Sequence, residues 1–155
     1  MDNEYWLNRA IQLAEENVAN GGGPFGAVIV RDGELIAEGV NRVTATPDPT
    51  AHAEVVAIRN AAQRLGSHQL SGCQIFSSCE PCPMCLGAIY WSRLEAIYFA
   101  ASRFDAAAAN FDDQFLYEEF ALPFEQRRIP IQEQAHERKL APFAAWQAFA
   151  AKQAY

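Results

Sequence analysis

Two short motifs constrain this chain more than any other part of its sequence. His52 opens the tripeptide His-Ala-Glu, and Cys82 and Cys85 lie in the pentapeptide Pro-Cys-Pro-Met-Cys. One histidine and two cysteines suit zinc, and a catalytic zinc keeps its fourth position open for water or substrate. If His52, Cys82 and Cys85 bind one ion, the fold must bring together two segments that lie far apart in the sequence.

Both motifs are expected at the N-termini of helices. Thr50 can cap a helix over about residues 52–65. Pro81 and Pro83 fit the first turn of another helix, which runs to about Trp91. The free N–H groups and the dipole of a helix N-terminus favour thiolates. Two helix N-termini can therefore converge on one zinc ion.

The other elements up to Ser102 follow from hydrophobic periodicity and turn residues. We expect a helix at residues 3–19, strands at 27–31 and 34–38 around an Asp-Gly hairpin turn, and strands at 73–78 and 94–100. The inward face of the first helix is predicted to carry Leu7, Ala10, Ile11, Ala14 and Val18. This order of elements predicts an α/β fold, a three-layer α/β/α sandwich with a central mixed sheet.

Periodicity weakens in the last third of the chain. We expect a helix near residues 112–120, a strand at 129–133 and a terminal helix at about 142–152. Phe143, Trp146 and Phe149 are predicted to point inward from that last helix. The chain has 155 residues, half of them apolar, and it lacks internal repeats and long linkers. We therefore predict a single domain over residues 1–155.

Composition bears on partners and location. The formal net charge is −7, and an acidic chain is a poor match for nucleic acid, whose phosphates are bound by Lys and Arg. No apolar run approaches the roughly 20 residues of a membrane span. The N-terminus lacks the features of a secretory signal. Four cysteines, two of them at metal spacing, are too few for a disulfide scaffold. We expect a cytoplasmic protein that acts on a small molecule, without nucleic acid or membrane partners.

Glu54 is the expected proton carrier of the site. Two thiolates and a neutral imidazole leave a bound zinc formally uncharged, so it should acidify water less than a site made of histidines alone. A carboxylate is then needed to take the proton from the attacking water. Glu54 lies two residues after His52 and is the natural candidate.

Other interpretations of the motifs remain open at this stage. A Cys-x-x-Cys pair can be a redox pair or half of a structural zinc site, and Cys79 could supply a fourth ligand that closes the site. The chain would then be a binding module. As a separate alternative, it is an interaction protein whose functional surface is Trp91 and the face of the helix at residues 83–91. We favour catalysis, because both motifs occur together at predicted helix starts. Cys79 is then a small buried neighbour, and Cys73 is a core residue.

The motifs extend into a family resemblance. The generic parts are residues 24–28 (Pro-Phe-Gly-Ala-Val), 52–54 and 81–85. The pattern H-x-E…P-C-x-x-C is the signature of zinc nucleobase deaminases. These parts resemble the cytidine-deaminase-like superfamily, including its tRNA adenosine deaminases. Residues 48–54, 86–91 and 111–113, together with residues 142–146 and the terminal Tyr155, resemble more closely its bacterial guanine deaminases.

The resemblance implies a function and a set of site residues. It implies a cytidine-deaminase-like fold with a C-terminal helical lid, one Zn²⁺ per subunit, and hydrolysis of guanine to xanthine and ammonia in purine catabolism. Asn41 would hydrogen-bond the purine edge, Phe25 would stack on its ring, Asp113 would accept from ring N–H groups, and Tyr155 would help to close the pocket. It also implies a homodimer, in which exchanged C-terminal segments can cover the partner's site. Cytosine, adenine, an aminotriazine or adenosine in tRNA remain alternative substrates.

One further candidate comes from the residues themselves. Glu118 follows Asp113 on a predicted helix, at a spacing that allows both side chains to face one pocket. Ammonia leaves only after protonation, and a second carboxylate would relieve Glu54 of serving both ends of the substrate. We hypothesise that Glu118 assists proton delivery. The alternative is that it belongs to a solvated acidic helix face.

Overall fold

The computed structural model describes residues 2–155. It divides the chain into two compact units, of which the first ends at Phe115 and the second runs from Leu116 to Tyr155. The single domain expected over residues 1–155 stays a prediction. Over residues 2–155, no helix is both long enough and apolar enough to span a membrane.

The first unit is built on a mixed four-stranded sheet with the order β2-β1-β3-β4. β1 is antiparallel to both β2 and β3, whereas β3 and β4 are parallel. The strands are β1 (Gly26–Arg31), β2 (Glu34–Val40), β3 (Cys73–Cys79) and β4 (Ala96–Ala101). The predicted hairpin is confirmed: Asp32 and Gly33 have φ angles of 52° and 76°, and a type I′ turn requires positive φ at both central residues.

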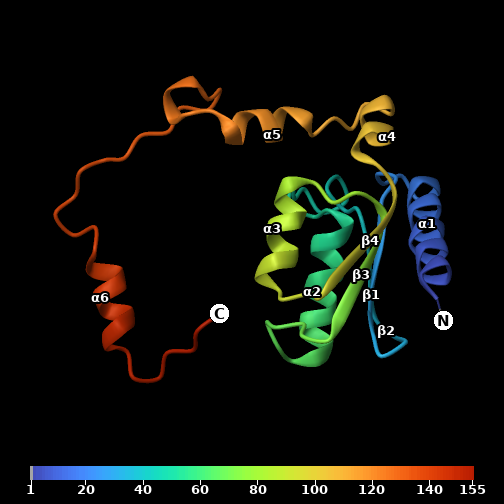
Figure 1. Ribbon diagram of the computed structural model, residues 1–155, viewed down its shortest axis with the longest axis horizontal. Coiled ribbons are helices and arrows are strands. Elements are labelled where there is room, and N and C mark those ends of the chain that lie inside the picture. Colours follow the sequence, from blue (N-terminus) through green and yellow to red (C-terminus); the bar gives the residue numbers. More distant parts are fainter. Residues whose placement is uncertain (1) are drawn as a thin grey trace. The chain divides into compact units, whose positions relative to one another are not determined.

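Helices cover both faces of this sheet (Figure 1). α1 (Asn3–Ala19) lies on one face, and α2 (Ala53–Leu65) and α3 (Pro83–Trp91) lie on the other. Alternate residues of a strand point to opposite faces of the sheet. In β1 the residues on both faces are buried. Ile29 packs in the cluster beneath α2 and α3, and Val28 packs with Trp6 beneath α1. The predicted three-layer α/β/α sandwich is therefore confirmed.

The buried face of α1 differs in part from the prediction. Its buried residues are Trp6, Ala10, Leu13 and Ala14, whereas Val18 is 52% exposed. Trp6 packs against Phe76 of β3 with ring centroids 6.5 Å apart. This large aromatic contact sets the rotation of the helix on the sheet, and the end of α1 that carries Val18 remains in solvent.

α2 begins differently from the prediction, although its extent is confirmed. Thr50 does not cap it: the backbone N–H and Oγ of Thr50 both donate to Asp48 Oδ1, at 2.9 and 2.6 Å. His52 occupies the N-cap position. The first turn of α2 lies so close to β2 that a Cβ on Gly39 would collide with the backbone of Ala53 and Ala57. The sheet thus supports the helix turn that carries Glu54.

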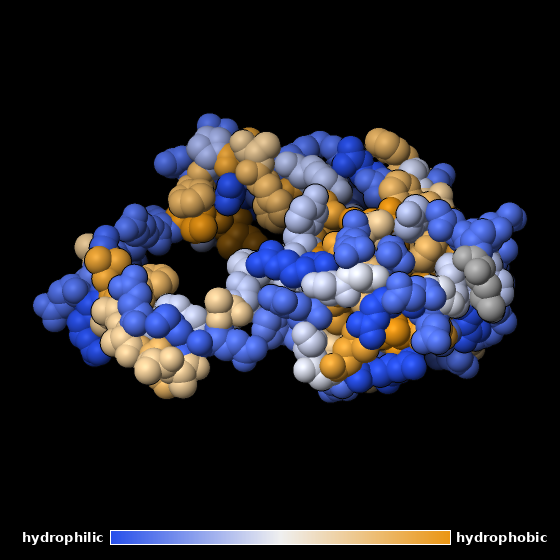
Figure 2. Space-filling view, turned by 60° about the horizontal axis from the view of Figure 1, so that its bottom comes forward, coloured by the Kyte–Doolittle hydropathy of each residue, from blue (hydrophilic) through white to orange (hydrophobic). Residues whose placement is uncertain are grey.

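The regular elements of the last third of the chain are helices: α4 (Arg103–Ala108), α5 (Gln114–Ala121), the 3₁₀ helix η1 (Phe124–Gln126) and α6 (Ala141–Ala148). The expected helices near 112–120 and 142–152 correspond to α5 and α6. The strand expected at 129–133 was wrong, because these residues form no strand. Phe143, Trp146 and Phe149 were wrongly placed inward, since they are 64%, 41% and 55% exposed. None of residues 116–155 is buried within the chain, and Figure 2 shows apolar residues on the surface of the second unit.

Candidate active site

Three ligand side chains converge at the N-termini of α2 and α3. His52 and Cys82 occupy the N-cap positions, where their backbone is extended and their side chains make no capping hydrogen bond. Cys85 is buried in the first turn of α3. The ligand atoms of His52, Cys82 and Cys85 all lie within 4.8 Å of one another. The fold therefore brings together the two motifs, which lie far apart in the sequence, as the sequence predicts.

The distances fit zinc. His52 Nδ1 lies 3.6 Å from Cys82 Sγ and 3.5 Å from Cys85 Sγ. Tetrahedral zinc with Zn–N of about 2.1 Å and Zn–S of about 2.3 Å would separate N and S by about 3.6 Å. The donor set and its spacing thus suit one Zn²⁺, held through Nδ1 of the histidine. Three protein ligands leave one position open.

The electrostatics of the two cysteines suit a thiolate site. A hydrogen bond from Cys85, followed by the hydrogen bond with His52, lowers the pKa of Cys82 to about 4. The hydrogen bond with Cys82 also raises the pKa of His52. Cys82 is thus the first of the two thiols to ionise, and a cation at the site would favour ionisation of both.

Cys79 stays apart from this ligand group. Its Sγ lies 3.7 Å from the carbonyl oxygen of Ser102, and burial raises its pKa to about 11. Among residues 2–155, the group that could hold a metal ion comprises His52, Cys82 and Cys85 alone. This arrangement supports the prediction that Cys79 is a buried neighbour, and it disfavours the closed four-ligand site.

Glu54 lies in the first turn of α2, beside the ligand group. It is 6% exposed, and its Oε1 accepts a hydrogen bond from Ser77 Oγ at 3.3 Å. Burial raises the pKa of Glu54. Ser77 has no signal in the sequence, because nothing in the spacing of β3 indicates which hydroxyl meets a carboxylate on another element. The structure thus adds Ser77 as a side chain that holds the carboxylate.

Asn41 and Asp113 lie in two loops of the first unit. Asn41 follows β2, and its Oδ1 accepts from the backbone N–H of Val43 at 3.2 Å, which leaves the NH₂ group as the part it can offer to a ligand. Asp113 is half-buried, and burial raises its pKa. It lies near enough to His52 and Cys82 to interact with both electrostatically. Both predicted binding residues therefore lie in the first unit, which also holds the metal ligands.

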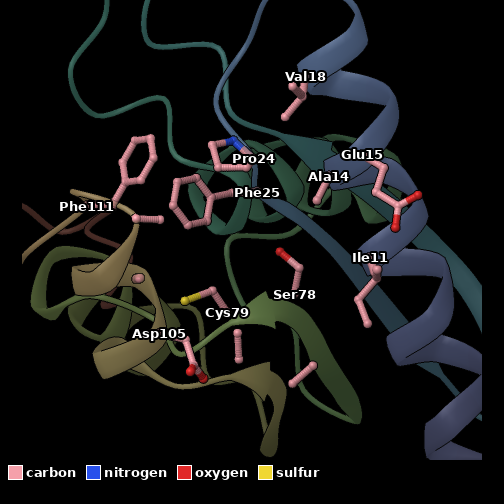
Figure 3. A pocket seen from close by; sticks show the side chains of 14 residues that line it. Ile11, Ala14, Glu15, Val18, Pro24, Phe25, Ser78, Cys79, Asp105 and Phe111 are labelled. Atoms are coloured by element: carbon pink, nitrogen blue, oxygen red, sulfur yellow. The ribbon is translucent and has the colours of Figure 1, made fainter.

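Phe25 lies at the edge of an apolar pocket of about 430 Å³. Its ring meets that of Phe111 edge to face, with centroids 5.1 Å apart. Figure 3 shows these two rings across the pocket from the labelled residues of α1, with Ser78 and Cys79 below Phe25 in the view. None of the three metal-ligating residues lines this pocket, so it is not the centre of the metal site. The contact between Phe111 and Phe25 was not predicted from the sequence.

Glu118 and Tyr155, the other two predicted site residues, belong to the second unit. Both are exposed there, and Tyr155 is 74% exposed. Their part in the site therefore stays a prediction.

Residues 1–101 match the family model for the cytidine and deoxycytidylate deaminase zinc-binding region. The chain belongs to this deaminase family. It is accordingly a zinc-dependent hydrolytic enzyme, and the match spans the sequence that carries all three metal ligands and Glu54. Family membership excludes an inert binding module as the main interpretation of the site.

Relatives of this deaminase extend the comparison to the whole chain. It is 56% identical to the guanine deaminase of Bacillus subtilis, with 100% of both sequences covered. The crystal structure of that guanine deaminase gives a TM-score of 0.98, with 100% of this chain and 99% of the other covered. A tRNA-specific adenosine deaminase of Aquifex aeolicus is 43% identical over 65% of this chain and 67% of its own length.

A second solved structure carries a purine analogue. It is a mutant of NE0047 in complex with 8-azaguanine, 36% identical, with a TM-score of 0.70. The alignment covers 72% of this chain and 65% of that one. The tRNA-specific relative thus resembles about two thirds of this chain, and the guanine deaminase resembles all of it.

Proposed function

We propose that this enzyme hydrolyses guanine to xanthine and ammonia, with one Zn²⁺ per subunit. The observation that carries the proposal is the 56% identity to a guanine deaminase over the whole length of both chains. The tRNA-specific relative matches 65% of this chain, whereas the guanine deaminase matches all of it, and this difference favours guanine as the substrate. The net charge of −7 also disfavours a tRNA substrate.

Glu54 carries the protons of the reaction. His52, Cys82 and Cys85 would hold the zinc ion, which would supply a water molecule of lowered pKa. Glu54 accepts a proton from the attacking water while the oxygen of that water bonds to C2 of guanine. Glu54 then delivers this proton to ring N3. The carboxylate next takes the proton of the new C2 hydroxyl and passes it to the amino group, and the C2–N bond breaks to release ammonia and leave the C2 carbonyl of xanthine. Ser77 holds the carboxylate of Glu54 from the side of β3.

The purine is bound by residues around this centre. Phe25 offers a ring face for stacking, Asn41 offers its NH₂ group to the purine edge, and Asp113 accepts from ring N–H groups. Tyr155 would help to close the pocket, as the family resemblance implies. These roles follow from the family resemblance together with the positions of the loops in the first unit.

Ammonia release from a substrate panel tests the proposal. The zinc-loaded chain would be given guanine, guanosine, adenine, cytosine, cytidine, an aminotriazine and an adenosine-bearing tRNA hairpin. We expect release from guanine above all, with aminotriazines as side substrates because they too carry an amine between two ring nitrogens. Release from cytosine or from the hairpin but not from guanine would overturn the substrate and leave the deaminase chemistry intact.

We propose that Glu118 assists proton delivery to the leaving amine. Replacing Glu118 by Gln should lower kcat by on the order of tenfold, below the 10²- to 10⁴-fold typical of a main general acid. Steady-state kinetics on guanine would measure this. Glu119→Gln is the matched control, because Glu119 instead accepts from the backbone N–H of Arg128 at 2.9 Å. An unchanged kcat in Glu118→Gln would assign that residue to a solvated helix face.

We also propose a homodimer in which exchanged C-terminal segments complete the partner's site. α3 exposes Met84, Tyr90 and Trp91, with Tyr90 71% and Trp91 63% exposed, and the second unit buries none of its residues within one chain. A second copy would cover such apolar surface. Sedimentation should give a dimer, and Trp91→Glu should shift it to monomer with loss of activity. A monomeric, fully active wild type would contradict this.

A cytoplasmic location is proposed with this assignment. All four cysteines are free thiols, and two of them serve as metal ligands, which is typical of a reducing compartment. A role in purine catabolism follows from the proposed reaction.

A further inference from the structure

Glu80 makes two bonds that clip the end of β3 to the start of α4. It lies between the last residue of β3 and the metal-binding pentapeptide. Its backbone N–H donates to the carbonyl of Ala101 at 2.8 Å, and its Oε1 accepts from the backbone N–H of Arg103 at 3.1 Å. The loop that holds Cys82 is thereby tied to the segment that follows β4.

α4 depends on such anchors because it is short. It has six residues, and isolated helices of this length are unstable in water. Ser102 and Asp105 form a capping box that satisfies two N–H groups of its first turn. The carboxylate of Glu80 satisfies a third, that of Arg103, and its negative charge favours the position at a helix N-terminus.

The far end of α4 fixes the direction in which the chain leaves. Asn110 is left-handed, with φ of 68°, and donates its N–H to Ala107 O at 3.0 Å. Phe111 donates its N–H to Ala106 O at 2.9 Å. These two bonds form a Schellman motif, which sets the path of the residues that follow. Asp113 comes two residues after Phe111, whose ring packs against Phe25.

We propose that Glu80 is a positioning residue that sets Asp113 relative to the metal ligands through α4. This inference rests on the proposed function, in which Asp113 binds guanine. The hydrogen bond between the Glu80 carboxylate and the backbone N–H of Arg103 joins the loop that holds Cys82 to the start of α4. The Schellman motif at the other end of α4 then sets the path of the chain to Asp113. A displacement of about 1 Å in a binding group can cost on the order of a hundredfold in rate.

The chain offers a matched control at the other end of the same two strands. The backbone N–H of Glu95 donates to Cys73 O at 2.9 Å, and its Oε1 accepts from the backbone N–H of Gly72, also at 2.9 Å. Glu95 thus makes the same pair of bonds as Glu80, one from its backbone N–H and one to its carboxylate. It does so at the opposite end of β3 and β4 from Cys79, the residue after which β3 leads to the metal loop. Removal of either carboxylate deletes one hydrogen bond to a backbone N–H.

The test compares Glu80→Ala, Glu80→Gln and Glu95→Ala in the zinc-loaded protein. Glu80→Ala should keep its zinc and lose on the order of tenfold to a hundredfold in kcat/KM for guanine. Glu80→Gln retains an acceptor oxygen and should restore most of the activity, whereas Glu95→Ala should behave as wild type. Adding Glu80→Ala to Asp113→Ala should cost little more, because Glu80 acts through Asp113.

Hydrogen exchange supplies a readout that does not depend on turnover. Amides of residues 103–113 should lose protection in Glu80→Ala and keep it in Glu95→Ala. Equal losses of activity in both alanine variants, loss of zinc from Glu80→Ala, full additivity with Asp113→Ala, or unchanged protection would each overturn the proposal. Failure of the wild type to release ammonia from guanine would instead refute the proposed function, and the exchange experiment would still test the anchor.

Discussion

Glu54→Gln should keep its zinc and lose nearly all turnover of guanine. The carboxylate is not a metal ligand, and its position beside the ligand group is held by Ser77. It moves protons at both the attack and the departure of the amine, so kcat should fall by roughly 10³- to 10⁴-fold, the upper part of the range for general acid–base catalysis. Kinetics together with metal analysis by plasma mass spectrometry would measure both properties.

The same chemical change at a surface position provides the control. Glu34 is exposed at the start of β2, and Glu34→Gln should leave both zinc content and kcat unchanged. If Glu54→Gln retained substantial activity, another group would have to carry the protons, and the assignment of Glu54 would be withdrawn. Zinc loss from the variant would show that Glu54 helps to hold the metal site together.

Cys85→Ala should lose zinc and all measurable deamination. Cys85 is buried, with its Sγ 3.5 Å from His52 Nδ1, so alanine removes one of three ligands. The loss of zinc affinity should exceed the roughly 10- to 100-fold that removal of a ligand's hydrogen-bonding partner costs. Equilibrium dialysis with ⁶⁵Zn would measure affinity, and an ammonia assay would measure activity.

Cys79→Ala is the matched control for this variant. Cys79 lies close in sequence and is also buried, but its Sγ contacts the carbonyl of Ser102 and lies outside the ligand group. We expect one bound zinc and activity near that of the wild type. Joint loss of zinc in both variants would support a four-ligand structural site and would count against catalysis at this metal.

Local sequence signals predicted the elements of the first unit well. Helix 3–19, the Asp-Gly hairpin and the two helix starts at the motifs depend on neighbours within a few residues, so their patterns are visible in one sequence. The last third was predicted less well. The apolar pattern at residues 129–133 suggested a strand, but Ile129 is 81% exposed and nothing in the second unit is buried. A pattern of apolar residues indicates which side chains need to be covered, but it does not indicate which surface will cover them.

The sequence by itself determined the chemistry of the site. A histidine, two cysteines and a glutamate in these spacings have few uses other than a zinc deaminase centre. The tertiary structure decided which atoms act. It placed His52 at the N-cap with Nδ1 toward the thiols, Ser77 against Glu54, and Glu80 against the first turn of α4. These contacts join residues that are far apart along the chain, and only the packing of helices on the sheet brings them within hydrogen-bonding distance.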